Sequence, residues 1–150
     1  VAEAYGVSTE YWAFDGSLTP VSDATLIKVL AAMDVDVSSA DSARRAIRDS
    51  ELRPWRQMIP ECTIVRQGHE SGIQIHVPHG SSLHVYMELE DGTRIDLRQV
   101  DDFTPPRDVD GVLHGQASFI VPRSIPLGYH TVYADGHGPA GGGVLADHAP

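Results

Sequence analysis

The sequence predicts a mainly β protein: an immunoglobulin-like antiparallel β-sandwich of about seven strands, preceded by a small helical segment with a β-hairpin. Three observations lead to this fold class. Apolar residues recur with a period near 3.6 before residue 58 and alternate with a period of two from Cys62 onward. Glycine and proline are concentrated late in the chain, where they separate short alternating runs. Asp91-Gly92 lies between two such runs and is the strongest hairpin signal in the chain.

The 150 residues are enough to bury a core without disulfides, and they divide into two expected parts. We expect residues 1–57 to form the helical segment, residues 58–147 to form the sandwich, and residues 148–150 to begin a linker. The chain starts with Val1 rather than Met and ends after a glycine run. We therefore expect it to be a piece of a longer protein.

The first part contains cap and turn signals. Val1–Gly6 resembles the last turns of a helix with Gly6 as its C-terminal cap. Asp15-Gly16 predicts the turn of a hairpin between Thr9–Phe14 and Ser17–Val21. Ser22 is the expected N-cap of a helix that continues to Met33.

A second helix is expected from Ser39 or Asp41 to Leu52, because Ala43, Ala46 and Ile47 then share an inward face. Pro54 is expected to end that helix, since proline lacks the backbone N–H that the helix requires.

The second part reads as short strands joined by turns, with a long crossing at residues 101–111. Tyr129 follows Pro126-Leu127-Gly128 at the start of a late strand, where a tyrosine can lock a sandwich corner, so we expect it to anchor the fold. The predicted strands are Cys62–Arg66, Ile73–Val77, Leu83–Leu89, Arg94–Val100, Gly115–Val121, Tyr129–Ala134 and Gly143–Ala146.

Charge and cysteine content restrict the partners and the compartment. The chain has 11 Lys and Arg against 21 Asp and Glu, a net charge of -10. Nucleic acid and anionic membranes are therefore not expected as partners. Cys62 is the single cysteine, so no internal disulfide can form. Together with the lack of a signal peptide or an apolar run of bilayer length, this indicates a cytoplasmic protein.

The sequence offers little catalytic chemistry, and we expect no catalytic residue, no cofactor and no metal. His76 and His79 could form a metal pair, but Pro78 and Gly80 place them at a strand end without further ligands. An alternative is a calcium site built from Asp101, Asp102, Asp108 and Asp110. The nucleophile elbow, the P-loop and the dinucleotide fingerprint do not occur in the sequence.

Aromatic residues provide one candidate binding site. Tyr11, Trp12 and Trp55 could form a platform on which sugar rings stack, with Phe14 beside them. The alternative is that these side chains form the core between the hairpin and the two helices.

Seven segments in a fixed order resemble the N-terminal region of actinobacterial amylomaltases, the 4-alpha-glucanotransferases encoded as MalQ. The resemblance covers nearly the whole chain, and its specificity lies in the ordered series, since each segment alone is short. The segments are Ala4–Trp12, Asp15–Gly16, Ala24–Met33, Arg53–Pro60, Val77–Gly80, Glu88–Gly92 and Pro126–Thr131.

The resemblance implies an accessory domain. The family's enzymes transfer α-1,4-glucan segments between maltooligosaccharides by a retaining double displacement. Their catalytic carboxylates lie in a (β/α)8 barrel, which would follow Pro150, so no catalytic residue is carried onto this chain. The expected partner is this downstream barrel, and maltooligosaccharides or glucan are a further candidate. The open hypotheses are a structural or docking domain, a glucan-binding module, and an unrelated immunoglobulin-like interaction domain.

Overall fold

The chain forms two compact units in the computed structural model, which describes residues 1–139 and 143–150. Unit 1 comprises Val1–Arg53 and unit 2 comprises Pro54–Pro150. The boundary lies just before the one expected after residue 57. Each unit has its own cluster of buried apolar side chains, so each is described separately.

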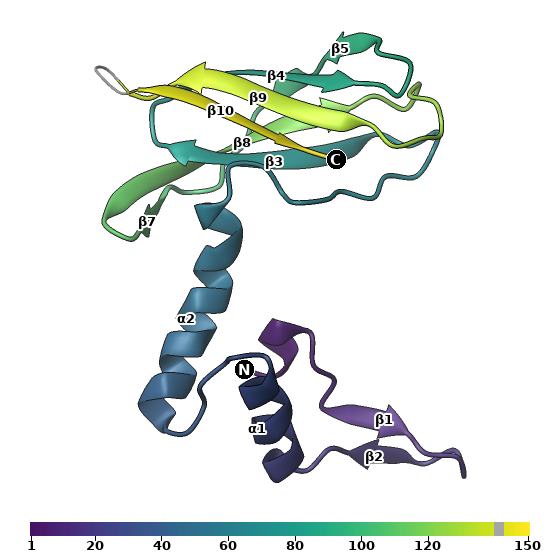
Figure 1. Ribbon diagram of the computed structural model, residues 1–150, viewed down its shortest axis with the longest axis vertical. Coiled ribbons are helices and arrows are strands. Elements are labelled where there is room, and N and C mark those ends of the chain that lie inside the picture. The colour runs from purple at the N-terminus through teal and green to yellow at the C-terminus, as the bar shows by residue number, and fades with distance from the viewer. Residues whose placement is uncertain (140–142) are drawn as a thin grey trace. The chain divides into compact units, whose positions relative to one another are not determined.

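Unit 1 begins with a short helical turn and a hairpin (Figure 1). The 3-10 helix η1 (Glu3–Tyr5) ends at Gly6, whose φ of 73° is left-handed, so the predicted glycine cap is confirmed. Strands β1 (Glu10–Trp12) and β2 (Leu18–Pro20) pair antiparallel, with Tyr11 opposite Thr19. The predicted hairpin at Asp15-Gly16 is confirmed, and the backbone N–H of Ser17 donates to the Asp15 carboxylate.

The two predicted helices complete unit 1. Helix α1 (Asp23–Ala32) is capped by Ser22, whose Oγ accepts a 3.3 Å hydrogen bond from the N–H of Thr25. Helix α2 (Ala40–Arg56) begins after Ser39. The Tyr5 hydroxyl donates a 3.0 Å hydrogen bond to the carbonyl of Ala46 in α2. The small core of the unit is formed by Ala2, Leu30, Val35 and Ala46.

The prediction that Pro54 ends the second helix is wrong, because α2 continues through it to Arg56. Proline removes one hydrogen bond to the preceding turn, but here only the last turn of the helix is affected. Trp55 is buried and packs on His76 at a centroid distance of 4.4 Å. The final turn is thus packed against β3 through Trp55.

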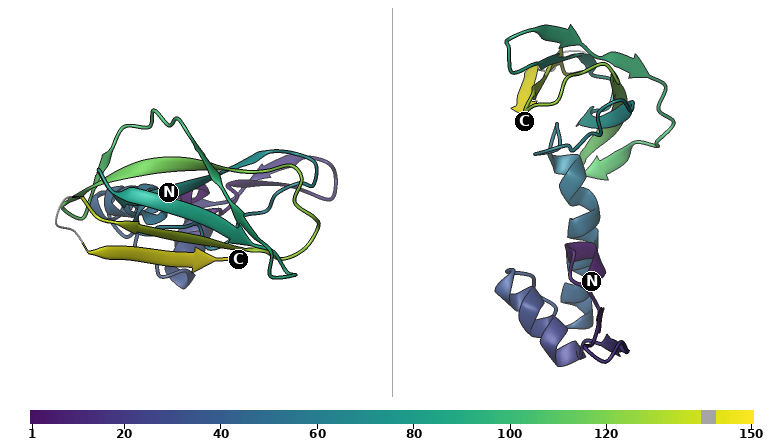
Figure 2. Two further views of the ribbon diagram at one scale, coloured as in Figure 1. Left: turned by 90° about the horizontal axis from the view of Figure 1, so that it is seen from above. Right: turned by 90° about the vertical axis from the view of Figure 1, so that its right-hand side faces the viewer.

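Unit 2 is an antiparallel β-sandwich, as predicted. One sheet has the order β10-β9-β4-β5 and the other has the order β3-β8-β6, with β7 also paired to β8. The two sheets lie on opposite sides of a common interior (Figure 2, right). The strands are β3 (Ser71–Pro78), β4 (Ser82–Glu88), β5 (Arg94–Asp96), β6 (Arg98–Val100), β7 (Arg107–Val109), β8 (Val112–Val121), β9 (Thr131–His137) and β10 (Val144–Ala149).

The strand order is immunoglobulin-like. The sheet β3-β8-β6 has the order of strands B, E and D, and β10-β9-β4-β5 has the order of G, F, C and C′. The segment predicted as one strand, Arg94–Val100, is divided between the two sheets at Leu97. Leu97 is buried, and its N–H donates a 2.8 Å hydrogen bond to the carbonyl of Val85. The chain therefore passes from one layer to the other at a single residue.

The core of unit 2 follows the period-two pattern. Ile73 and Ile75 on β3 face inward with Phe119 on β8, which is directly opposite Ile73 in the register. Val85 and Ala134, paired between β4 and β9, are the inward residues of the other sheet. The interior is therefore lined by alternate residues of both sheets, which is the packing expected for a sandwich.

Three predicted boundaries of unit 2 are wrong. Residues 62–66 form no strand, because their backbone pairs with neither sheet and Ile64 is fully exposed in the loop. The long crossing at residues 101–111 contains the short strand β7. Residues 148 and 149, expected to begin a linker, belong to β10, where Ala149 pairs with Val132 and is buried.

Candidate functional site

The hairpin aromatics of unit 1 are exposed. Tyr11 is 54% exposed and Trp12 is 73% exposed, and Phe14 is fully exposed at the hairpin tip. The alternative prediction, that these side chains form the core between hairpin and helices, is therefore wrong. A two-stranded hairpin can cover only one face of each ring, and α1 and α2 bury smaller apolar residues instead.

Trp55 is buried within unit 2, so its assignment as a sugar-stacking residue is corrected. Its ring is 7% exposed, packs on His76 and lies under the guanidinium of Arg107 at 5.4 Å. Sugar stacking requires a free ring face, which Trp55 lacks. The sequence grouped Trp55 with Tyr11 and Trp12 only because all three are aromatic. The indole instead covers the outer face of the β3-β8-β6 sheet.

His76 belongs to a polar network on that sheet. Its Nε2 atom lies 3.0 Å from Oε1 of Gln116, and the Nε2 of Gln116 donates a 2.9 Å hydrogen bond to Oδ2 of Asp102. The hydroxyl of Ser118 donates a 2.5 Å hydrogen bond to the same carboxylate oxygen. Because the ring of His76 contacts Gln116 rather than a hydroxyl or thiol, the network does not form a nucleophile–base pair.

The environment of Asp102 favours its charged form. The hydrogen bond from Ser118 is the main cause that lowers its pKa, and hydrogen bonds from Thr104 and Gln116 act in the same direction against partial desolvation. The carboxylate thereby holds the crossing segment that contains Thr104 against β8. Asp102 is one of the four acids considered as calcium ligands, and its contacts here are structural.

The other candidate ligands are dispersed. The carboxylate of Asp110 accepts a 2.7 Å hydrogen bond from Nε of Arg56 at an exposed ion pair, which lowers its pKa. His79 packs against Gly115, where its Nδ1 would lie 3.1 Å from an added Cβ. Among residues 1–139 and 143–150, no group of three or more His, Cys, Asp or Glu side chains could hold a metal ion.

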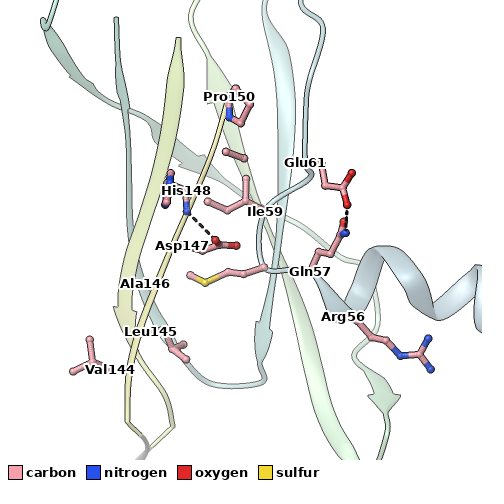
Figure 3. A pocket seen from close by; sticks show the side chains of 12 residues that line it. Arg56, Gln57, Ile59, Glu61, Val144, Leu145, Ala146, Asp147, His148 and Pro150 are labelled. Carbon is pink, nitrogen blue, oxygen red and sulfur yellow. Dashed lines mark hydrogen bonds between the residues drawn. The ribbon is translucent and has the colours of Figure 1, made fainter. Parts of the chain in front are cut away.

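An open groove of about 710 Å³ lies along β10 (Figure 3). Its other wall is the segment that follows α2, where Nε2 of Gln57 donates a 2.8 Å hydrogen bond to Glu61. Asp147 and His148 line the groove from the edge strand, and Ile59 lines it beneath. The sequence does not predict this groove, because the groove depends on the edge of β10 remaining uncovered after folding. Whether the edge of a strand stays uncovered depends on the tertiary structure, which the local alternation of apolar residues does not indicate.

A smaller, more apolar cavity of about 220 Å³ opens at one end of the sandwich. Cys62, Ile64 and Tyr129 lie at its lining, over buried residues of both sheets. The prediction that Tyr129 anchors a sandwich corner is wrong, because its side chain is 89% exposed. Only its backbone is held, by a 2.9 Å hydrogen bond from its N–H to Oε1 of Glu90.

Fold and site together define a class of protein: an immunoglobulin-like β-sandwich domain that presents grooves and exposed apolar side chains, with no grouped metal ligands in the part of the chain that the structure describes. The described residues also contain no helix long and apolar enough to cross a membrane. The chain belongs to the family of MalQ N-terminal beta sandwich domains, whose family model matches residues 58–145. The resemblance drawn from the ordered sequence segments is confirmed.

Relatives extend the match beyond the sandwich. The chain is 38% identical over 133 residues to 4-alpha-glucanotransferases of Mycobacterium bovis and Mycobacterium tuberculosis, which covers 88% of this chain and 18% of each relative. It is also similar to the crystal structure of amylomaltase from Corynebacterium glutamicum, with a TM-score of 0.88 and 35% identity, over 99% of this chain and 21% of that chain. The chain thus spans about a fifth of the length of these proteins.

Proposed function

We propose that this chain is the N-terminal accessory domain of a 4-alpha-glucanotransferase and acts as a structural and docking domain for the catalytic part. The observation that carries the proposal is the match to glucanotransferases over 88% of this chain but only 18% of each relative. The parent enzyme would transfer α-1,4-glucan segments between maltooligosaccharides, in the metabolism of maltose, starch or glycogen. Its catalytic residues would lie in the (β/α)8 barrel, outside this sequence.

The character of unit 2 supports a docking role. Asp102, the most strongly perturbed acid described in unit 2, is engaged with Ser118 in a contact that stabilises the sheet, while the surface of the unit is apolar at one end and grooved along β10. Contiguous exposed apolar surface is typical of a surface that packs on another domain. A cytoplasmic location is part of the proposal, and the exposed, unpaired thiol of Cys62 is compatible with a reducing compartment.

Deletion in the parent enzyme tests the docking role. We expect removal of residues 1–150 to lower the melting temperature of the remaining catalytic part and to reduce its disproportionation rate with maltotriose. Both effects follow because a catalytic surface that is normally covered would be exposed to water. A truncated enzyme with unchanged melting temperature and unchanged rate would contradict the proposal.

A second candidate function, glucan binding, is favoured by the exposed rings of Tyr11 and Trp12 on β1. Flat aromatic faces with this exposure can stack on the apolar face of a glucose ring. The chain contains two tryptophans, and the second, Trp55, is buried, which provides an internal control.

Titration with maltoheptaose, followed by the two indole N–H signals in NMR spectra, tests this candidate. The Trp12 signal is expected to shift and the Trp55 signal to stay in place, and Trp12→Ala is expected to abolish binding. If neither indole shifts at millimolar sugar, glucan binding by the hairpin is contradicted.

A further inference from the structure

The apolar cavity at the end of the sandwich has the form of a docking socket. Its floor consists of buried residues from both sheets, among them Ile73, Met87, Val121 and Val132. A volume of about 220 Å³ is large enough for one or two large side chains. The floor belongs to the core of the unit, so the socket is an opening into the sandwich interior rather than a surface depression.

The rim of the socket exposes large apolar side chains to water. Ile64 is 94% exposed and Tyr129 is 89% exposed, and both line the cavity. Leu127, which precedes the lining residue Gly128, is 75% exposed. Single exposed apolar residues are common on protein surfaces, but two that line one apolar opening, with Leu127 beside a third lining residue, indicate a surface that another molecule covers.

The loop that presents Leu127 and Tyr129 is held in one conformation. The Glu90 carboxylate accepts a hydrogen bond from the N–H of Tyr129, and Nε2 of His130 lies 3.0 Å from the carbonyl oxygen of Pro126. Gly128 has a φ of 154°, and a Cβ at this position would lie 2.5 Å from Oε2 of Glu90. A fixed loop loses little conformational entropy when a partner binds, so its exposed side chains are preorganised for docking.

The position of Pro150 favours an occupant of the socket that comes from the same polypeptide. Pro150 also lines the socket, next to Ala149 at the end of β10. In the matched relatives about four-fifths of the polypeptide lies outside the region that corresponds to this chain. Polypeptide that continues from Pro150 would therefore leave unit 2 beside the socket, and also beside the β10 groove, which Pro150 lines as well.

We propose that this socket is the surface through which unit 2 docks on the catalytic part of its own polypeptide, with apolar side chains of that part entering between Ile64 and Tyr129. The proposal rests on the proposed accessory function. Sugar is a poor occupant, because the lining is mainly aliphatic and offers few hydrogen-bond groups for hydroxyls. A second copy of the chain is the alternative occupant that the experiment must separate.

Cys62 lines the socket and is exposed in this chain, so its reactivity reports whether the socket is covered. The experiment measures iodoacetamide labelling of the Cys62 peptide by mass spectrometry in the full-length enzyme. Its reference is a cysteine introduced by Val112→Cys at the start of β8, a position that does not line the socket. We expect Cys62 to be labelled at least tenfold more slowly than this reference.

Rim variants in the full-length enzyme complete the test. Leu127→Asp and Tyr129→Ser change exposed side chains, so unit 2 is expected to fold, and each should raise the Cys62 labelling rate severalfold. Phe103→Asp changes a fully exposed aromatic residue that does not line the socket, and it should leave the rate unchanged.

The outcomes separate this proposal from the accessory function. Labelling of Cys62 as fast as the reference overturns the docking socket, even if deletion of residues 1–150 destabilises the enzyme. Protection that disappears on dilution assigns the socket to a second copy and also overturns the proposal. If the deletion has no effect, the accessory function itself fails.

Discussion

Gln116 bridges two side chains that lie far apart in the sequence: its amide nitrogen donates to Asp102 at 2.9 Å, and its amide oxygen lies 3.0 Å from Nε2 of His76. The bridge connects the crossing segment to β3 across β8. Since His76 in turn packs on Trp55, the end of α2, the sheet and the crossing segment form one connected layer within unit 2. Trp55 and the crossing segment are thus held on the outer face of that sheet through His76 and Gln116.

Replacement of Asp102 by Asn is expected to destabilise unit 2. The carboxylate accepts several hydrogen bonds, and bonds to a charged group contribute about 1.5–3 kcal/mol each at most, so a net loss of about 1–3 kcal/mol is expected at pH 7. Urea unfolding measures the change. Asp101→Asn, which alters an exposed neighbour, is the matched control, and an equal effect of both substitutions would contradict a specific role of Asp102.

The same carboxylate predicts acid sensitivity. The pKa of Asp102 is lowered from 3.8 in the folded state, chiefly by the Ser118 hydrogen bond, so its contribution is complete above the unfolded-state pKa. That contribution is lost as the pH falls below the unfolded-state pKa toward the folded-state pKa. The unfolding free energy of the wild type should therefore fall more steeply below about pH 4 than that of Asp102→Asn. Parallel curves for the two proteins would refute this.

Gly136→Ala is expected to disrupt the pairing of β9 with β4. A Cβ at Gly136 would lie 2.0 Å from the carbonyl oxygen of Ser82, which is backbone and cannot rotate away. We expect a loss of about 1–3 kcal/mol, the usual range for overpacked sites, seen as a lower urea midpoint. Gly143→Ala is the control, since nothing lies within 4 Å of its added Cβ, and its midpoint should not change measurably.

Phe119→Ala is expected to be a strongly destabilising truncation in the core of the sandwich. Phe119 is one of the largest fully buried side chains, and loss of such a ring costs about 3–5 kcal/mol through lost burial and a residual cavity. Thermal unfolding measures the change. Phe103→Ala removes an exposed ring of the same size and is expected to change stability by no more than about 0.5 kcal/mol.

Ser22→Ala tests the N-cap of α1. Loss of the hydrogen bond from the N–H of Thr25 is expected to cost about 0.5–2 kcal/mol of helix stability, whereas Ser22→Gly should cost only a few tenths. Amide hydrogen exchange in the first turn of α1 is the measurement. Equal exchange rates in the wild type and Ser22→Ala would show that the cap contributes nothing.

Local signals predicted much of the fold. The cap at Ser22, the left-handed Gly6 and the Asp91-Gly92 turn are each specified by one or two residues, and all three occur in the structure. Alternation located most strands of unit 2, because inward and outward positions differ in hydrophobicity wherever one face is buried. These features require no knowledge of distant residues.

Long-range features were predicted less well. Trp55 is buried because His76 and Arg107 lie against it, and neither is near it in the sequence. The division of Arg94–Val100 at Leu97 changes partner strands without changing the alternation, so the pattern could not reveal it. The backbone of Tyr129 is bound by Glu90, which lies 39 residues away in the sequence, so local pattern does not report the conformation of this loop.

The sequence predicted that the hairpin aromatics Tyr11 and Trp12 are a candidate sugar site, but it did not predict the groove along β10 or the apolar cavity at the end of the sandwich. Grooves arise from the strand edges and loop conformations that remain uncovered after folding. The available signal is the presence of large apolar residues, Ile64 and Leu127, in two separate segments rich in turn residues, where no sheet buries them.

The strand switch at Leu97 has a mechanical consequence. Asp96 ends β5 and Arg98 begins β6, so two peptide units of about 3.8 Å each join the layers, less than the roughly 10 Å between packed sheets. The two sheets therefore lie closer together along the β5–β6 side than packed sheets usually do. The layers cannot shear past each other by even one residue without stretching that link, so separation under load must begin from the opposite side, at β10.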